Sequence, residues 1–308
     1  MSIGVLPPRA VRARAILGRL SAGTTGNLVR AIGGNRKALA GLVLLLIFVF
    51  LALLPGTVAH DNPNAEIYAR SAAPSGAHLL GTTAYGQDIF SQWVFSTRES
   101  LFIAIAAGGL ATVLSVLIGV SAAYRGGAVD GVLSLFTDVF LVIPAFPLVV
   151  VIAAYSKNGG NAIIIAVLVV TGWSYGARQL RSQALSLRGR DFLVAARVRG
   201  ERAWRIIVFE ILPTMTSLIV ANFLGAALYA ILAAAGLQFI GLGNPDSMSW
   251  GTMLYWAENN EALQAGSPLW AIAPGIGIAL LGAAFSLLNY AFDEIANPAL
   301  RPIRRRRG

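Results

Sequence analysis

Six long apolar stretches, separated by polar segments, run through the chain and predict six membrane-spanning helices. About 20 residues at 1.5 Å per residue cross a hydrocarbon core of roughly 30 Å. The stretches cover residues 38–54, 101–124, 132–155, 162–173, 215–235 and 270–291. The fourth is short, and an extension towards Arg178 would complete it. Pro144 and Pro147 predict a kink in the third, because each removes a backbone donor.

Composition excludes an ordinary soluble domain. Apolar residues make up 56% and charged residues 12% of the 308 residues, and the mean hydropathy is +0.69. About a quarter of a typical globular domain is charged. The net charge of +10 could suggest nucleic-acid binding, but the basic residues flank apolar stretches, where they set membrane topology. We therefore expect an all-α protein that is embedded in a lipid bilayer and binds no nucleic acid.

The distribution of basic residues predicts the orientation. If the N-terminus is cytoplasmic, 21 of the 24 Lys and Arg residues lie inside and 3 lie outside. The inner segments are then 1–38, 124–132, 178–210 and 293–308, and the outer ones are 59–100, 155–161 and 236–270. Because Lys and Arg concentrate in cytoplasmic loops, both ends of the chain are expected in the cytoplasm.

The first apolar stretch follows a long basic leader and predicts an uncleaved anchor helix. A cleaved signal peptide is the alternative, because Thr57-Val58-Ala59 resembles a cleavage site. The leader and the apolar core are both longer than such peptides have. The leader itself could be disordered or lie on the membrane surface. The predicted organisation is a basic tail (1–37), an anchor helix (38–58), an extracytoplasmic loop (59–96), a five-helix core (97–298) and a basic tail (299–308).

The sequence offers little for catalysis or for a metal centre. It contains no cysteine, and His60 and His78 are its two histidines, so we expect no catalytic residue, no metal site and no cofactor. A Walker A loop needs a Gly-Lys-Ser/Thr sequence to cradle phosphates, whereas the two lysines, Lys37 and Lys157, precede Ala38 and Asn158. If ATP drives this protein, ATP and Mg must bind to partner subunits.

Asp138 is a carboxylate within the third apolar stretch, and such a residue is a candidate for transport. It lies near the cytoplasmic end of that stretch, so pairing with a basic neighbour or solvation at the interface is the favoured alternative. A secondary transporter or channel usually carries paired ionisable groups or repeat symmetry, and Asp138 stands nearly alone. Five tryptophans near span ends favour interfacial belts over a substrate path: Trp93, Trp173, Trp250, Trp256 and Trp270.

The longest predicted cytoplasmic loop between spans, 178–211, carries a helical pattern with two faces. At 100° per residue, one face gathers small residues and one aromatic ring, and the other gathers charge. The first face holds Phe192, Ala195, Ala196, Arg199, Gly200 and Ala203, and the second holds Arg190, Arg197, Glu201 and Arg205. Because small residues allow close approach, the first face is expected to dock into a groove, although a break at Gly200 would change the angles beyond it.

Ala195-Ala196, Gly200 and Leu212-Pro213 in this loop resemble the EAA loop of binding-protein-dependent ATP-binding-cassette (ABC) importer permeases. In that family the loop contains a coupling helix that docks on the ATPase subunit. The preceding Asp191-Phe192-Leu193-Val194 resembles the start of the loop in the peptide branch. The resemblance therefore implies an EAA loop at 190–213. Its implied coupling residues are Asp191, Phe192, Ala195, Ala196, Arg199, Gly200, Leu212 and Pro213.

Two further stretches resemble the oligopeptide and dipeptide permeases of this family. One runs from Leu80 to Ser91 and leads to Arg98-Glu99-Ser100-Leu101, and the other joins Phe239–Gly243 to Trp250–Leu254. The basic leader and anchor resemble the C-type subunit of the permease pair. Three residues depart from the branch pattern: Gln87 replaces a frequent Arg, Glu210 a common His and Thr214 a common Asn.

The resemblance implies a type I importer permease with a MetI-like fold in a bacterial plasma membrane. A second homologous permease, two ATPase subunits and an extracytoplasmic binding protein are its expected partners. Peptides are the expected cargo, with oligosaccharides and nickel as alternatives, because relatives in this branch import these too. The substrate-binding residues stay unassigned, since selection in this family falls largely on the binding protein.

Overall fold

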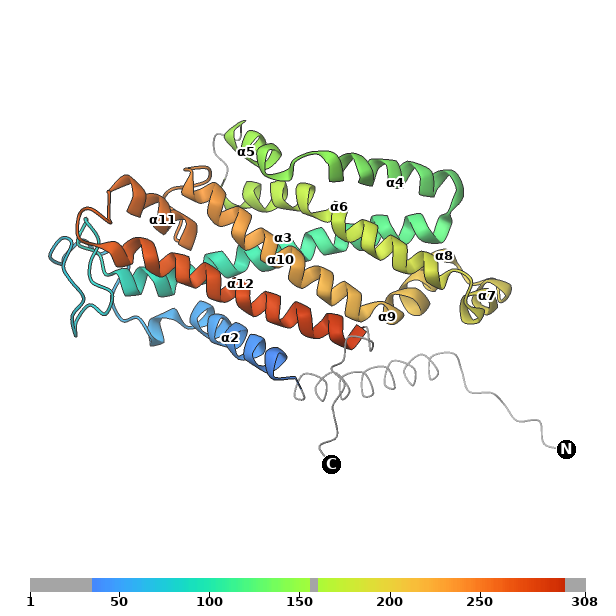
Figure 1. The fold of residues 1–308 in the computed structure, drawn as a ribbon, viewed down its shortest axis with the longest axis horizontal. Helices are drawn as coiled ribbons and strands as arrows, with labels where there is room; N and C mark the ends of the chain where they lie inside the picture. The colour runs from blue at the N-terminus through green and yellow to red at the C-terminus, as the bar shows by residue number, and fades with distance from the viewer. Residues whose placement is uncertain (1–34, 156–159, 297–308) are drawn as a thin grey trace, which may run out of the picture.

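The computed structural model describes residues 35–155 and 160–296, which form an elongated bundle of helices (Figure 1). The helices are α2 (Arg36–Leu53), α3 (Ile89–Arg125), α4 (Gly127–Val142), α5 (Ala145–Tyr155), α6 (Asn161–Leu187), α7 (Asp191–Val198), α8 (Ala203–Ile206), α9 (Leu212–Thr214), α10 (Thr216–Phe239), α11 (Trp250–Asn259) and α12 (Pro268–Ala296). Within the described residues there is no strand, only an isolated bridge between Thr82 and Asp88. Apart from residues 35–37, the predicted tails at 1–37 and 299–308 lie outside the described ranges.

Five helices, namely α2, α3, α6, α10 and α12, are long and apolar enough to cross a membrane. Helices α4 and α5 meet that condition only together, and they are bent by 84° where they meet. Pro144 lies in the break, and Ile143 before it has extended backbone with φ −66° and ψ 126°. The predicted kink is therefore confirmed, and the six predicted spans correspond to five helices and one broken pair.

The helix bounds differ from the apolar stretches mainly at the ends. Helix α3 begins at Ile89, not near 101, because the Asp88 side chain caps it by accepting a 2.7 Å hydrogen bond from the Ser91 amide. Its 37 residues extend about 55 Å at 1.5 Å per residue, well beyond the hydrocarbon core. Helix α6 continues past Arg178 to Leu187. Helix α11 was not predicted, and a capping box between Ser249 and Thr252 starts it.

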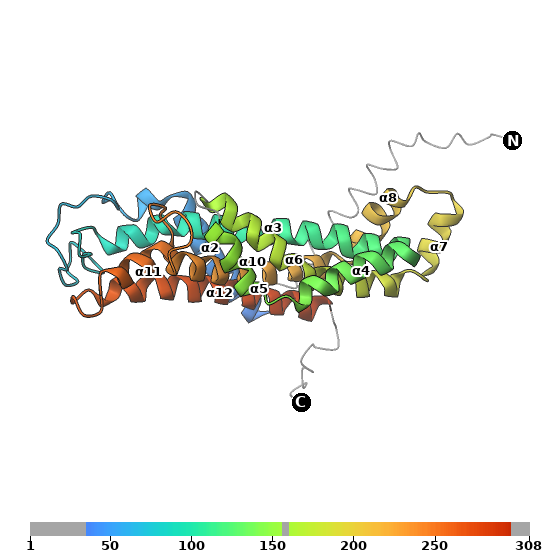
Figure 2. The same ribbon diagram turned by 90° about the horizontal axis from the view of Figure 1, so that it is seen from above.

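Small residues allow the long helices to approach closely, as is usual where membrane helices pack. A Cβ on Gly108 of α3 would lie 2.7 Å from the Ala227 backbone nitrogen of α10. Gly119 of α3 lies against the Ala177 backbone of α6 in the same way. Figures 1 and 2 show α3 running through the centre of the bundle, with α6 and α10 beside it.

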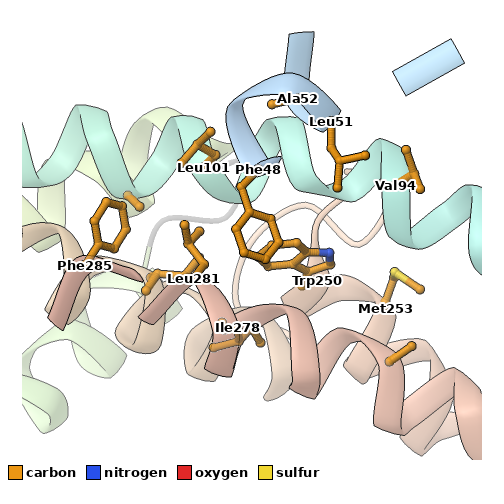
Figure 3. Packing of buried hydrophobic residues seen from close by; sticks show 14 of the residues in the cluster. Phe48, Leu51, Ala52, Val94, Leu101, Trp250, Met253, Ile278, Leu281 and Phe285 are labelled. Carbon is orange, nitrogen blue, oxygen red and sulfur yellow. The ribbon is translucent and has the colours of Figure 1, made fainter. Parts of the chain in front are cut away.

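The two ends of the bundle are built from different segments. Helices α7 and α8 form one end, and the loop 58–88 and α11 form the opposite end (Figures 1 and 2). We call these the α7 end and the α11 end. Near the α11 end, Phe48 of α2 packs on Trp250 of α11, with ring centroids 5.5 Å apart, beside Leu281 of α12 (Figure 3). The first predicted span is thus packed into the bundle as helix α2.

The tryptophans correct the expectation of interfacial belts. Trp173, Trp250 and Trp270 are at most 2% exposed, and they pack inside the protein rather than towards lipid headgroups. Trp93 stacks on Trp250 with ring centroids 5.9 Å apart and donates its indole N–H to the Ala273 carbonyl at 2.8 Å. Their position in the sequence near span ends therefore reflects packing between helices at the α11 end and beside α4.

Candidate coupling site and transmembrane cavity

Helix α7 is a short helix with a sharply defined end. Asp191 lies in its first turn, where a carboxylate is favoured by the helix dipole. Gly200 ends it in the left-handed conformation with φ +71°. The Gly200 amide donates to the Arg197 carbonyl at 2.9 Å and the Glu201 amide to the Ala196 carbonyl at 3.2 Å, which is a Schellman cap. Gly200 therefore terminates the helix, and no neighbouring atom lies within 4 Å of the position of its missing Cβ.

The inner side of α7 packs into the chain's own core. Leu193 and Ala196 are fully buried. They join a cluster, here called the cytoplasmic-loop cluster, whose buried members are Val120, Ala123, Leu180, Ala184, Leu193, Ala196, Ile206, Ile211 and Met215. This cluster connects α7 and α8 to α3, α6 and the start of α10. The prediction that Ala196 lies on an exposed docking face is therefore wrong, because its side chain is fully buried in this cluster.

The outer side of α7 exposes apolar side chains. Phe192 is 38%, Val194 46% and Val198 83% exposed, and Ala195 and Arg199 are exposed beside them. Trp204 of α8 and Phe209 lie beside each other, with ring centroids 6.2 Å apart. Trp204 is 58% and Phe209 50% exposed. Grouped apolar exposure of this kind is typical of surfaces that bind a protein partner or a membrane. We call the exposed side chains of Phe192, Val194, Ala195, Val198 and Arg199 the outer face of α7.

The charged residues around α7 make short-range contacts. Arg199 donates from Nε to Glu201 at 3.1 Å, and Arg205 lies 3.8 Å from the same carboxylate. The Arg197 guanidinium lies 5.5 Å from the centroid of the Tyr124 ring at the end of α3. Arg199 thus stabilises the turn after Gly200, and Arg197 contacts α3 on the side predicted to be away from the docking face.

Leu212 and Pro213 lie where the loop re-enters the bundle. A π-helical turn, Ile207–Ile211, precedes them, and the Leu212 amide donates to the Ile207 carbonyl. Leu212 is half-buried against the cytoplasmic-loop cluster, and Pro213 is exposed. Such π turns often occur at functional sites. The outer face, the cluster and this turn together connect an exposed apolar surface to the beginning of α10.

A cavity of about 630 Å³ opens between the α4–α5 break and helices α6, α10 and α12. Its polar lining is neutral and includes Tyr175, Gln179, Asn222, Tyr229 and Asn289. Within the described residues, Tyr229 Oη and Asn289 Oδ1 are buried and have no hydrogen-bond partner. Polar groups in spans are costly unless they are used. This cavity was not predicted from the sequence, although the amide and phenol side chains inside apolar stretches were a signal for it.

Asp138 pairs with a basic neighbour, as one of the favoured alternatives to a role in transport predicted. Its carboxylate lies 3.8 Å from Arg178, and both side chains are more than half exposed. One turn further along α6, Arg181 binds Asp130 of α4 through two hydrogen bonds of 2.6 and 2.8 Å. These pairs join α4 to α6, and Asp138 is absent from the lining of the transmembrane cavity.

In the loop at the α11 end, Asp61, His78 and Asp88 have ligand atoms within 4.8 Å of one another. His78 Nδ1 lies 3.0 Å from Asp88 Oδ1, while Asp88 Oδ2 caps α3. A hydrogen bond from Tyr68 to Asp61 raises the pKa of the Tyr68 phenol. Since Asp88 already binds two protein groups, we interpret this cluster as one that stabilises the conformation of the loop.

The fold and these two features define the class of protein. A multi-pass helical bundle with a neutral polar cavity between its spans and an exposed apolar surface at one end has the features of a membrane transport protein. The family described as binding-protein-dependent transport system inner membrane component matches residues 115–302. This chain belongs to that family, and it is a membrane component of an ABC importer rather than an enzyme.

Curated relatives extend the similarity over most of the chain. The oligopeptide transport system permease protein OppC of Mycobacterium tuberculosis is 31% identical over 281 residues, which are 90% of this chain and 96% of that protein. The dipeptide transport system permease protein DppC of Bacillus subtilis is 29% identical over 92% of this chain and 88% of its own. The DppC protein of Alkalihalophilus pseudofirmus is 31% identical over 87% of each chain.

Proposed function

We propose that this chain is one of two homologous permease subunits of an importer for dipeptides and oligopeptides, and that it forms half of the translocation pathway. Two ATPase subunits dock on the α7 end and bind the ATP and Mg, so the chain itself needs no cofactor. An extracytoplasmic binding protein delivers the peptide at the α11 end. The names of the relatives support peptides as cargo, and the distribution of Lys and Arg supports cytoplasmic termini.

The single observation that carries the coupling role is the opposite burial of the two sides of α7. The outer face is exposed and mostly apolar, whereas Leu193 and Ala196 are fully buried in the cytoplasmic-loop cluster with residues of α3 and α6. A close-packed interior transmits displacement, because it has few voids that could absorb it. Movement of the ATPase subunits against the outer face therefore shifts the inner ends of α3, α6 and α10 together, and access to the cavity alternates between the two sides of the membrane.

The lining of the transmembrane cavity supports a peptide over a metal ion. Tyr, Asn and Gln groups can both donate and accept hydrogen bonds, as the amide groups of a peptide main chain require. Nickel prefers imidazole and thiolate ligands among protein groups, and neither His nor Cys lines this cavity. A neutral lining also tolerates peptides with different side-chain charges. Oligosaccharides would find similar hydrogen bonds, so uptake must separate these two cargoes.

Reconstitution of the complete importer in proteoliposomes tests the proposal. The chain is purified with its partner permease, its ATPase subunits and its binding protein, and uptake of a labelled tripeptide is measured with and without ATP. We expect uptake to require both ATP and the binding protein. Unlabelled peptides should compete with the labelled tripeptide, whereas oligosaccharides and nickel should not. Uptake in vesicles that lack the ATPase subunits would instead indicate a secondary transporter and would overturn the proposal.

A pair of matched variants tests the docking surface in the same preparation. Phe192→Glu places a carboxylate on the outer face, whereas Leu263→Glu makes a comparable change at a residue that is 64% exposed at the α11 end. We expect Phe192→Glu to weaken retention of the ATPase subunits during purification about tenfold or more, because a desolvated carboxylate is costly at an interface. Equal retention in both variants would show that the outer face of α7 is not the docking surface.

A further inference from the structure

Helix α4 carries part of the wall of the transmembrane cavity, although it lies at the edge of the packed bundle. Residues 140–142 at its end and 143–145 after it line that cavity. Within the described structure, Thr137 is the one buried residue of α4, and the helix lies against α3 and α6 (Figures 1 and 2). A displacement of α4 would therefore change the shape of the cavity while disturbing little of the core.

The backbone is broken at both ends of α4. Before it, Gly126 and Gly127 both have positive φ, +67° and +56°, which is a conformation that glycine adopts readily. After it, the chain bends by 84° into α5 at Ile143 and Pro144. Residues at the ends of elements, often small ones, absorb the dihedral changes of hinge movements. Helix α4 can therefore move as a rigid segment between two hinges, and the backbone alone couples it weakly to α3.

Two ion pairs join α4 to the inner part of α6. Arg181 donates from Nε and Nη2 to the two carboxylate oxygens of Asp130, at 2.6 and 2.8 Å, and both side chains are less than a third exposed. Ser134 donates to the same carboxylate at 3.3 Å. Two turns further along α4, Asp138 lies 3.8 Å from Arg178. Because a bidentate pair of Arg and carboxylate has a defined geometry, the first pair fixes the position of α4 along α6.

The apolar contact between the two helices is less directional. Phe136 stacks on Trp173 with ring centroids 5.6 Å apart, and Phe140 lies 5.4 Å from the same ring. Apolar packing resists separation but has no preferred direction, so these rings alone would let α4 slide or turn on α6. A pocket of about 100 Å³ between α3, α4 and α6 leaves room for such movement. The ion pairs are thus the contacts that make α4 follow α6.

The ion-paired part of α6 leads directly into α7. Helix α6 ends at Leu187 and α7 begins at Asp191, so one short turn separates them. Leu180 of α6 and Leu193 of α7 are both fully buried in the cytoplasmic-loop cluster. A displacement of α7 therefore moves the last turns of α6, because both the backbone and the packing connect them, and these turns carry Arg181.

We propose that the Asp130–Arg181 and Asp138–Arg178 pairs transmit movement of α7 to α4, and so to the wall of the transmembrane cavity. This rests on the proposed function of the chain as a permease of an ATP-driven importer. When α7 is displaced, the last turns of α6 carry the two guanidinium groups with them, and the paired carboxylates move α4. The breaks at both ends of α4 absorb its rotation. All four are positioning residues, since none of them lines the cavity.

The ratio of peptide uptake to ATP hydrolysis by the complete importer in proteoliposomes tests this role. In a chain with both Asp130→Asn and Asp138→Asn, we expect the ratio to fall about tenfold, because hydrogen bonds to charged groups shift an equilibrium by at least that factor. ATP hydrolysis and retention of the ATPase subunits should stay at parent levels, since the outer face of α7 is unchanged. An unchanged ratio, or an equal fall in both rates, would overturn the proposal.

Glu258→Gln is the matched control for the loss of a carboxylate. Glu258 is exposed on α11 and forms no ion pair in the part of the chain that the structure describes. Its ratio of uptake to hydrolysis should equal that of the parent chain. A fall as large as in the Asp130 and Asp138 variant would show that the effect does not depend on the link between α4 and α6.

Spin labels on α4 and α6 follow the link directly. The chain has no native cysteine, and Val132→Cys and Ser182→Cys place labels at exposed positions. Distances are measured by electron paramagnetic resonance in the complete importer, without nucleotide and with ATP trapped by vanadate. We expect one narrow distance distribution in both states, and a broader one when Asp130→Asn and Asp138→Asn are added. A distance that changes with nucleotide in the parent chain would overturn the proposal, because α4 would then not follow α6.

Uptake by the parent importer separates this proposal from the proposed function. If the parent transports peptides and the Asp130 and Asp138 variant keeps its ratio of uptake to hydrolysis, the link between α4 and α6 fails and the function stands. If the parent transports no peptide with ATP and the binding protein present, the proposed function fails instead. The spin-label distances then still decide whether α4 follows α6.

Discussion

The α7 end and the α11 end of the molecule are held together by different forces. At the α7 end, the side-chain hydrogen bonds that the described structure shows for residues 191–216 stay local, within four residues along the chain. Apolar packing in the cytoplasmic-loop cluster connects this segment to the spans. At the α11 end, hydrogen bonds join distant segments. Glu99 accepts from the Met248 amide at 3.1 Å, and the Trp250 amide donates to Ser100 at 3.0 Å.

This difference suits two different tasks. Hydrogen bonds are directional, so a network between distant segments fixes the shape of the α11 end. Apolar packing is non-directional, so α7 can shift against α3 and α6 without losing specific bonds. Under the proposed function, the α11 end is a rigid surface that receives the binding protein, and the α7 end transmits movement from the ATPase subunits.

The largest effect is expected from Ala196→Glu at the α7 end. Ala196 is fully buried in the cytoplasmic-loop cluster, and an unpaired buried carboxylate costs about 3–5 kcal/mol. We expect a lower melting temperature of the purified chain, reduced protein in the membrane and loss of uptake. Ala195→Glu is the matched control, because Ala195 is exposed. It should keep the melting temperature and weaken ATPase binding instead, so equal melting of the two variants would contradict the observed burial.

The contrast between Ala195 and Ala196 shows which property of α7 could not be predicted from the sequence, namely which residues are buried. An ideal helix places both residues on one broad face, and their shared resemblance to the EAA loop strengthened that grouping. Which of them turns inward depends on how α7 packs in the cluster that also contains Val120 of α3 and Leu180 of α6, which lie 75 and 15 positions before Ala195. A single sequence carries the periodicity of a helix but not the direction from which its neighbours approach.

The spans themselves were predictable, because an apolar stretch of sufficient length has few alternatives to crossing the membrane. The kink at Pro144 was predictable for a local reason as well. The transmembrane cavity was not, since Asn222 and Asn289 lie on segments far apart in the sequence and meet only in the fold. The burial of the tryptophans was missed for the same reason, because nearness to a span end also suits contacts between helices.

At the α11 end, Glu99→Ala should weaken the network that joins distant segments. Glu99 accepts from Asn161 at 2.6 Å and from the Met248 amide at 3.1 Å, so its loss leaves two donors without partners and costs about 2–3 kcal/mol. Thermal unfolding of the chain in detergent measures this loss. Glu258→Ala on exposed α11 surface is the control and should change stability by less than about 0.5 kcal/mol. A Glu99 variant as stable as the control would show that this end does not depend on such bonds.

A smaller effect is expected from Gly200→Ala, which strains the end of α7 without a clash. Gly200 has φ +71°, and nothing lies within 4 Å of the added Cβ, so the cost is the left-handed backbone itself, about 1–2 kcal/mol. Hydrogen exchange should accelerate at the Gly200 and Glu201 amides, which close the cap. Gly189→Ala is the control, because its Cβ also meets nothing and its φ is not positive. Similar exchange rates in both variants would show that the left-handed cap at Gly200 does not protect these amides.

The smallest effect on stability is expected from single cysteine substitutions. They test whether the two ends lie on opposite sides of the membrane. The chain has no native cysteine, so Asn259→Cys at the α11 end and Ser186→Cys near the α7 end can each be labelled without background. Both residues are exposed, and substitution should change stability by less than about 0.5 kcal/mol. In intact cells, an impermeant thiol reagent should label Asn259→Cys and leave Ser186→Cys unreacted until the membrane is opened. Labelling of both variants in intact cells would contradict the opposite placement, and with it the proposal that the α11 end receives the binding protein and that the α7 end transmits movement from the ATPase subunits.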